Sequence, residues 1–107
     1  MATSVVPNPN AVTYVNPSKV DASVWTGGSI ALRKCNGIVE VKLEGTVFAT
    51  TTERKAFAQC PEGYEPNTEV YFRDNTGVLI LITASGLMKT ESSAARTTWG
   101  TGMYIAR

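Results

Sequence analysis

SIALRKCNGIVEVKLEGTVF, residues 29–48, is the stretch of sequence that decides the fold. Asn36-Gly37 separates two runs rich in apolar and β-branched residues, over residues 29–35 and 38–48. This dipeptide is the favoured type I′ hairpin turn, because both of its central residues need a positive φ. The stretch therefore predicts a long antiparallel hairpin.

The second arm of this hairpin alternates between apolar and polar residues. Such alternation indicates a strand with one face in a core and the other face in water. Gly45 interrupts the pattern and predicts a β-bulge or a close approach of backbone. The residues expected to point inward are Val39, Val41, Leu43 and Val47, and those expected to point outward are Glu40, Lys42, Glu44 and Thr46.

The sequence after the hairpin extends this prediction to an all-β domain. Further short strands are expected over residues 69–73, with Val70 and Phe72 inward, and over residues 78–84, 87–90 and 98–106. Turn sequences separate them, among them CPEGYEP at residues 60–66 and DNTG at residues 74–77. TTERKAFA, residues 51–58, is the best candidate for a helix. About seven strands at this spacing predict a small antiparallel β-barrel or sandwich.

Residues 1–23 differ in composition from the expected globular domain, residues 24–107. Pro and Asn recur in this segment and little apolar patterning is present. Such a composition is typical of an extended N-terminal neck or arm, with one short strand expected at residues 12–15. A disordered tail explains the composition equally well.

VLILITA, residues 78–84, is apolar without alternation, so both faces of this strand should be covered. A domain of this size has few layers with which to cover a second face. We therefore expect other copies of the chain to cover it, with Val78, Ile80, Leu81 and Ile82 as the interface residues. The alternative is a central strand of a sandwich, covered on its outer face by the N-terminal arm.

The composition excludes several classes of function. The 107 residues contain no His, which removes Ser-His-Asp and Cys-His catalysis and the zinc sites that need imidazole. Ten basic and nine acidic residues give a net charge of +1, unlike a nucleic-acid-binding domain. Two cysteines, Cys35 and Cys60, are too few for a disulfide scaffold or a four-Cys metal site, and we expect no metal or cofactor. No signal peptide or membrane-spanning stretch is visible, so we expect a soluble protein made in the cytoplasm.

The residue types in this sequence favour a binding surface over an active site. Glycoside hydrolysis needs paired carboxylates, but Lys42 lies between Glu40 and Glu44, and Glu62 and Glu65 belong to a turn where surface solvation explains them. Saccharide binding needs aromatic rings for stacking and polar groups for hydroxyls. The candidate saccharide-binding residues at strand ends and turns are Trp99, Tyr71, Arg73, Asp74 and Arg96. The alternatives are a core position for Trp99 and a turn held by a local Arg73–Asp74 ion pair.

An ordered set of motifs runs along residues 24–107. A Trp before the domain is followed by SIALRKCNGIVEVKLEG, CPEGYEP, an apolar strand ending in ASGLM, and WGTGMYIA near the end of the sequence. This order resembles the C-terminal head domain of receptor-binding proteins, in the lower baseplate or tail tip of phages that infect Gram-positive bacteria. Fewer residues precede the head here than in lactococcal relatives.

The resemblance implies a β-barrel head that assembles as a homotrimer, with the N-terminal segment as its neck. It also implies a place in the virion tail tip or baseplate, after synthesis in the bacterial host cytoplasm, with other baseplate or tail proteins as partners. The implied activity is adhesion to host cell-wall polysaccharide without bond cleavage. Two other interpretations stay open. One is a structural virion protein, such as a head-fibre or decoration subunit, and the other is a small wall hydrolase with two facing carboxylates.

Overall fold

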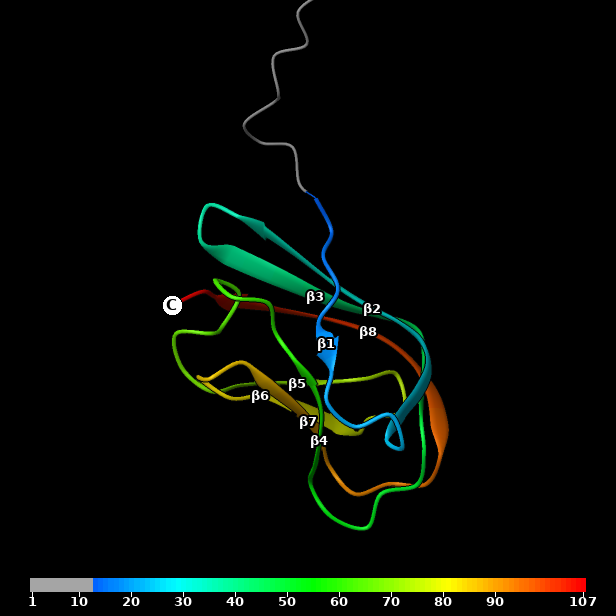
Figure 1. The fold of residues 1–107 in the computed structure, drawn as a ribbon. Coiled ribbons are helices and arrows are strands. Elements are labelled where there is room, and N and C mark those ends of the chain that lie inside the picture. The colour runs from blue at the N-terminus through cyan, green and yellow to red at the C-terminus, as the bar shows by residue number, and fades with distance from the viewer. Residues whose placement is uncertain (1–12) are drawn as a thin grey trace, which may run out of the picture.

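The computed structural model describes residues 13–107 and has an all-β fold, with no helix in that part of the chain (Figure 1). Eight strands form two antiparallel sheets, which confirms the all-β prediction. The strands are β1 (Ser18–Lys19), β2 (Trp25–Cys35), β3 (Ile38–Phe48), β4 (Lys55–Gln59), β5 (Val70–Arg73), β6 (Leu79–Ile82), β7 (Leu87–Thr90) and β8 (Arg96–Ile105).

The two sheets form a sandwich. The five-stranded sheet has the order β1-β4-β7-β6-β5, and the three-stranded sheet has the order β2-β3-β8. In Figure 1 the long strands β2, β3 and β8 arch over the shorter strands. β5 and β8, which are edge strands of different sheets, lie beside each other without a ladder between them. The described strands therefore do not close into a barrel, and of the two expected architectures the sandwich is the one that forms.

The turn between β2 and β3 has the predicted geometry. Asn36 and Gly37 have φ values of 52° and 77°, as a type I′ turn requires. Cys35 pairs with Ile38 across the turn, and the ladder continues in register from there as far as Ser29. The two residues Asn36-Gly37 thus set which side chains face each other along the whole hairpin.

The predicted bulge at Gly45 is present and changes which side chains reach the core. Gly45 has a φ of 60° and lies at a register shift between β3 and β8. The three inward residues before the bulge are buried as predicted. Beyond it Thr46 and Phe48 are buried, while Val47 is only half-buried. The predicted directions of Thr46 and Val47 are therefore wrong, because one extra residue shifts the alternation by one position.

The core lies between the two sheets and is centred on aromatic rings from both. Phe48 of β3 and Phe57 of β4 meet edge to face, with ring centroids 4.8 Å apart. Trp25 of β2 packs against the other side of Phe57 at 6.5 Å. Val70 and Phe72 of β5 pack against this cluster, which confirms their predicted inward direction.

Residues 51–58, the candidate helix, do not form a helix. Their second half enters β4, which pairs with β7. A register shift between Ala56 and Ala58 allows the consecutive residues Phe57 and Ala58 both to be buried. Packing of Phe57 in the core outweighs the weak local preference of a short segment for helix.

The apolar strand β6 is covered on both faces within one chain. Ile80 and Ile82 belong to the core cluster, and Leu81 is also buried, on the opposite face beside Lys89 of β7. Val78 precedes β6 and is half-buried. The prediction that these residues form an interface between copies of the chain is therefore wrong for Ile80, Leu81 and Ile82, because their side chains are inaccessible. On the outer face Leu81 lies between the cross-strand neighbours Tyr71 of β5 and Lys89 of β7, where the sequence alone suggests cover from another subunit.

The described part of the expected arm, residues 13–23, is attached to both sheets. Val15 exchanges two backbone hydrogen bonds of 2.8 Å with Leu32 at the edge of β2. Ser18 and Lys19 form β1, which pairs with β4. This part of the arm is thus built into the domain. Residues 1–12 of the expected arm, including Val12 of the strand expected at residues 12–15, lie outside the described residues.

Candidate functional site

The predicted saccharide-binding residues come from two neighbouring strands and the turn after one of them. Tyr71 and Arg73 lie on β5, Asp74 follows β5 directly, and Arg96 and Trp99 lie on β8. Asn75 joins the two segments, since its backbone N–H donates to Trp99 O and its Oδ1 accepts from the Trp99 N–H, both at 2.8 Å. The turn at residues 74–77 therefore holds the beginning of β8 against the end of β5.

Trp99 points to solvent, with 52% of its surface exposed. The alternative of a core position is wrong, because the inner face of β8 is formed by residues such as Gly100 and Gly102. The Phe72 ring occupies the space over Gly102 so closely that a Cβ added there would lie 2.6 Å from the ring. Phe72 of β5 is thus the aromatic side chain that packs inside β8, while the Trp99 indole faces outward.

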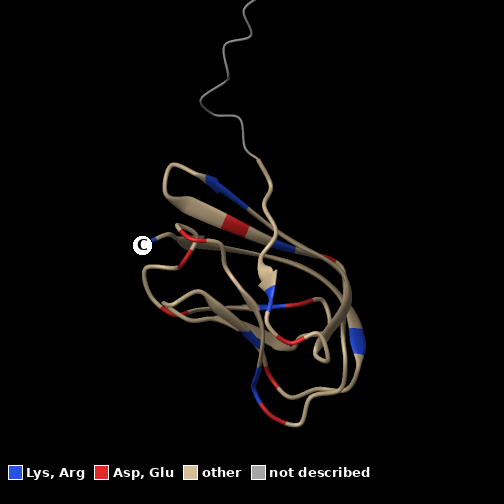
Figure 2. Ribbon diagram, in the orientation of Figure 1, with Lys and Arg blue, Asp and Glu red and all other residues tan. Residues whose placement is uncertain are grey.

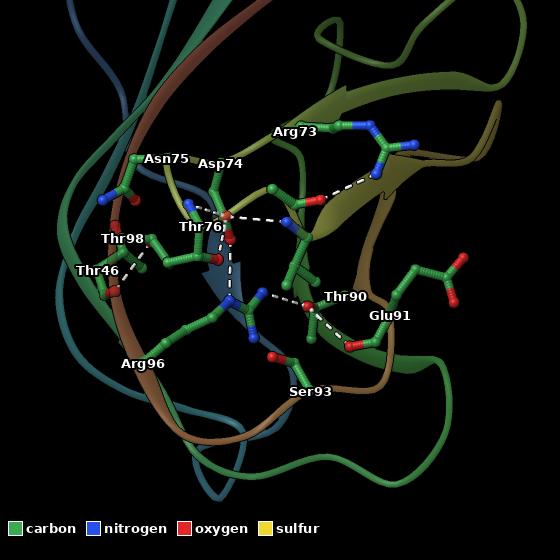
Figure 3. A network of polar contacts seen from close by, with 12 residues as sticks. Thr46, Arg73, Asp74, Asn75, Thr76, Thr90, Glu91, Ser93, Arg96 and Thr98 are labelled. Carbon is green, nitrogen blue, oxygen red and sulfur yellow. Dashed lines mark hydrogen bonds and ion pairs between the residues drawn. The ribbon is translucent and has the colours of Figure 1, made fainter.

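Tyr71 and Arg73 are also exposed, and both point to the same side of β5 because they are two residues apart. The Tyr71 hydroxyl donates to the Glu69 carboxylate, and this bond raises the pKa of Tyr71. Arg73 Nη1 donates to Gly77 O at 2.9 Å, and Figure 3 shows the guanidinium directed away from Asp74. A guanidinium has five N–H donors, so this single bond leaves Arg73 able to bind a ligand hydroxyl.

Asp74 and Arg96 lie inside the molecule, out of reach of a saccharide. Their side chains are 0% and 6% exposed, and Arg96 Nε donates to Asp74 Oδ2 at 2.9 Å (Figure 3). Arg96 also donates to Thr90 Oγ1 at 2.6 Å and stacks 4.8 Å from the ring centroid of Phe48. The predicted binding role of both residues is therefore corrected to a structural one. The expected local pair of Arg73 with Asp74 is replaced by this longer-range pair.

Asp74 also organises the turn that holds Trp99. Its Oδ1 accepts hydrogen bonds from Thr76 N at 2.8 Å, Thr76 Oγ1 at 2.5 Å and Val78 N at 3.2 Å. Burial alone raises the pKa of Asp74, but the hydrogen bonds from Thr76 and Arg96 outweigh it and hold the pKa below its ordinary value. The carboxylate stays ionised and fixes residues 74–77, so Asp74 positions Asn75 and, through it, Trp99.

The two cysteines are free thiols in separate environments. Cys60 is buried, with Sγ 3.7 Å from the Tyr104 hydroxyl, which itself donates to Tyr64 O at 2.7 Å. Burial raises the pKa of both Cys60 and Tyr104, so both stay protonated at neutral pH. Cys35 is half-buried and lies opposite Ile38 on the outer face of the hairpin. The Cys60 group is therefore part of the core, and Cys35 is the accessible thiol.

The candidate surface is open. Residues 13–107 enclose no pocket and contain no cluster of three side chains suited to hold a metal ion. Within the same residues no helix is long and apolar enough to cross a membrane. Sequence reasoning missed Asn75, which it assigned only to a turn. The available signal was an Asn in a DNTG turn directly after the predicted strand that carries Tyr71 and Arg73.

Comparison with known proteins does not place the chain in a family. No family model and no curated protein sequence matches it. Its functional assignment therefore depends on the motifs of the sequence and on the geometry described above.

Proposed function

We propose that this chain is the head of a phage tail or baseplate receptor-binding protein, which adheres to saccharides of the host cell wall without cleaving them. The observation that carries this proposal is the exposed indole of Trp99. The Trp99 backbone is held by two hydrogen bonds with Asn75, one donated by the Asn75 N–H and one accepted by its Oδ1, so the ring is presented on a fixed strand end and not on a free loop. A fixed, exposed aromatic face is what stacking against a pyranose ring requires.

Polar groups on β5 are further candidates for binding saccharide hydroxyls, on the side of β5 opposite the Phe72 ring that packs inside β8. Arg73 retains free donors, and the Tyr71 hydroxyl, hydrogen-bonded to Glu69, can accept a hydrogen bond from a sugar. Both side chains are exposed on β5, the strand beside β8. Glu44 lies directly opposite Trp99 on the same face, and Lys42 Nζ lies 3.8 Å from Glu44 Oε2, so the charges beside the ring are balanced, which suits neutral wall polysaccharides. The proposed site is therefore centred on Trp99, with Asn75 and Asp74 as positioning residues, while Tyr71 and Arg73 are candidate contacts on the outer side of β5.

The proposal includes assembly as a homotrimer at the tail tip or baseplate, together with other baseplate or tail proteins. The motif order of residues 24–107 supports this part. Trimer assembly presents several weak saccharide sites at once, and linked sites raise the overall affinity without any new contact. Shallow sites of this kind are therefore suited to adhesion on a repetitive wall polymer.

Binding to wall polysaccharide purified from Gram-positive bacteria tests the function. Trp99→Ala should weaken binding of the whole chain by at least about five-fold, since stacking on one aromatic ring accounts for roughly 1 kcal/mol or more. Trp99→Phe should retain much of the affinity, and Val20→Ala, at an exposed position away from this site, should retain all of it. Incubation should release no new reducing ends. Equal binding by the wild type and Trp99→Ala would remove the site, and no wild-type binding to any wall preparation would contradict the function.

A structural virion protein that binds no glycan is the second candidate. The observation that favours it is the exposed apolar side chains of Ile38, Met103 and Ile105, which have no group to bind a sugar hydroxyl. Tight binding to a capsid or baseplate protein, together with no detectable binding to wall polysaccharides, would favour this function over adhesion.

A further inference from the structure

The outer face of the three-stranded sheet carries most of the large apolar side chains that are exposed on the described residues. Four of the seven lie on this face: Ile38, Trp99, Met103 and Ile105. They share one face because β8 alternates, with residues 99, 101, 103 and 105 outward and Gly100, Gly102 and Tyr104 inward. Scattered exposed hydrophobic residues are common, but a group on one flat face marks an interaction surface.

Three of these side chains form a contiguous group at the hairpin end of the sheet. Ile38 of β3 lies directly opposite Ile105 of β8, and Met103 is the next outward residue along β8. Cys35 of β2 lies opposite Ile38 on its other side. We call these four residues the outer patch. Ile38, Met103 and Ile105 are 46%, 65% and 67% exposed, so the residues that the structure describes cover little of the patch.

The outer patch is unsuited to the saccharide site proposed at Trp99. Aliphatic and thioether side chains offer no strong donor or acceptor for a hydroxyl. They gain free energy only when another apolar surface displaces water from them. The occupant is therefore a protein surface with apolar side chains of its own.

The charges around the patch identify which protein surface fits. The charged side chains on this face are two cations and two anions, Arg33, Lys42, Glu40 and Glu44. Arg33 Nε lies 2.9 Å from Glu40 Oε1, and Lys42 Nζ lies 3.8 Å from Glu44 Oε2. Figure 2 shows the two signs alternating along β3. A strongly acidic or basic partner gains nothing from such a balanced face, whereas a second copy meets it without like-charge repulsion.

We propose that the outer patch is the contact between copies of this chain, arranged about a common axis on which Ile105 and Met103 meet their own counterparts. This inference deepens the self-assembly in the proposed function and replaces the interface that the sequence alone predicts at residues 78–82. Symmetry favours such an arrangement, because an apolar patch with a neutral border is complementary to itself. The Trp99 end of β8 stays free for saccharide.

Light scattering after size-exclusion chromatography of the full chain tests the proposal. The wild type should have the mass of three chains at about 50 µM, within the concentration range where interfaces of ordinary size associate. Met103→Lys/Ile105→Lys should raise the dissociation constant at least about 30-fold, as expected for the loss of central contact residues. Val20→Lys is the matched control, because Val20 is 51% exposed but lies outside this face, and it should not change the mass.

The outcomes separate the patch from the wider proposal. If the double variant still forms multimers, the outer patch is not the interface, although the chain does self-assemble. If the wild type is a monomer, both the interface and the self-assembly are contradicted. Saccharide binding is tested separately by the wall-polysaccharide assay. Should the double variant fail to fold, a bismaleimide that spans about 20 Å supplies a second measurement on the wild type, because each Cys35 lies two strands from the proposed axis. Cys35 lies in the patch and Cys60 is buried, so each chain offers one thiol, and covalent dimers should form in the wild type and disappear in Cys35→Ser. Their absence in the wild type would overturn the proposal.

Discussion

At the scale of single residues, the Asp74–Arg96 pair shows how a charge is tolerated inside this small domain. The Asp74 carboxylate accepts hydrogen bonds from a hydroxyl, two backbone amides and a guanidinium. Arg96 is bonded to Asp74 and Thr90 and stacks on Phe48. The unfavourable free energy of removing both charged groups from water is offset only while all these hydrogen-bonding partners are present. Each residue of the pair is therefore costly to remove alone.

Asp74→Ala should lower the free energy of unfolding by about 3–5 kcal/mol, because it leaves the Arg96 guanidinium buried without a counter-ion. Urea unfolding followed by tryptophan fluorescence measures this loss. The double variant Asp74→Ala/Arg96→Met should lose clearly less than the sum of the two single losses, since no unpaired charge remains. Additive losses would mean that the two residues do not act as a pair.

An exposed ion pair supplies the control for this experiment. Lys55 Nζ lies 3.1 Å from Glu53 Oε1 on the surface, where water and salt screen the attraction between the two charges. Lys55→Ala should change the free energy of unfolding by less than about 1 kcal/mol. The contrast between the two pairs then measures the effect of burial and separates it from that of charge alone.

At the scale of elements, two glycines lock the hairpin where β2 and β3 bend. Gly28 has a φ of 72° and faces the bulge at Gly45, and a Cβ added at Gly28 would lie 1.8 Å from Gly45 O. Gly28→Ala should therefore cost at least about 2 kcal/mol of stability, from the left-handed backbone and the clash together. Thermal unfolding by circular dichroism measures the loss.

Gly45→Ala is the matched variant for Gly28→Ala. Gly45 also has a positive φ, of 60°, but a Cβ added there meets nothing within 4 Å. Its loss should be only the backbone strain, about 1–2 kcal/mol. If Gly45→Ala lowers the stability as much as Gly28→Ala does, the close approach of Gly28 to Gly45 O is not the reason that residue 28 must be a glycine.

The elements also show which local signals the sequence carries. Asn36-Gly37 is sufficient to predict the hairpin and Gly45 to predict the bulge, because each requires a positive φ that favours one residue type. The burial of Thr46 in place of Val47 is beyond such prediction, since a bulge shifts the alternation by an amount that only the pairing with β8 reveals. Residues 51–58, the best helix candidate in the sequence, form no helix because Phe57 gains more in the core than the segment gains as a helix.

At the scale of the whole molecule, the errors concern contacts between residues far apart in the chain. The apolar run at residues 78–84 suggests a subunit interface because the sequence does not state that β6 lies between β5 and β7. Asp74 and Arg96 are 22 residues apart, and only the packing of β5 against β8 joins them. The exposure of Trp99 follows from the same packing, which places Phe72 on the inner face of β8. Local patterns thus predict strands, while the site requires the arrangement of the sheets.

The whole molecule should lose stability in acid and be insensitive to pH near neutrality. The pKa of Asp74 is held below its ordinary value of 3.8, and the pKa values of Asp21 and Glu65 are also lowered, by the Ser23 hydroxyl and by backbone amides. The unfolded chain therefore binds more protons in acid than the folded chain does. The stability from these carboxylates is fully present above the unfolded pKa and is lost as the pH falls through the folded values.

Urea unfolding between pH 3 and pH 7 checks this prediction. The free energy of unfolding should be constant from about pH 7 to pH 5, because the chain contains no His to titrate there, and should fall below about pH 4. Asp74→Asn should reduce the fall in the free energy of unfolding below pH 4, whatever its effect on the value near pH 7. The variant has no carboxyl group at residue 74, so that residue no longer takes up a proton on unfolding in acid. A wild type whose stability rises on acidification, or an Asp74→Asn variant with an unchanged slope, would show that Asp74 is not the ionised partner of Arg96 in the folded protein.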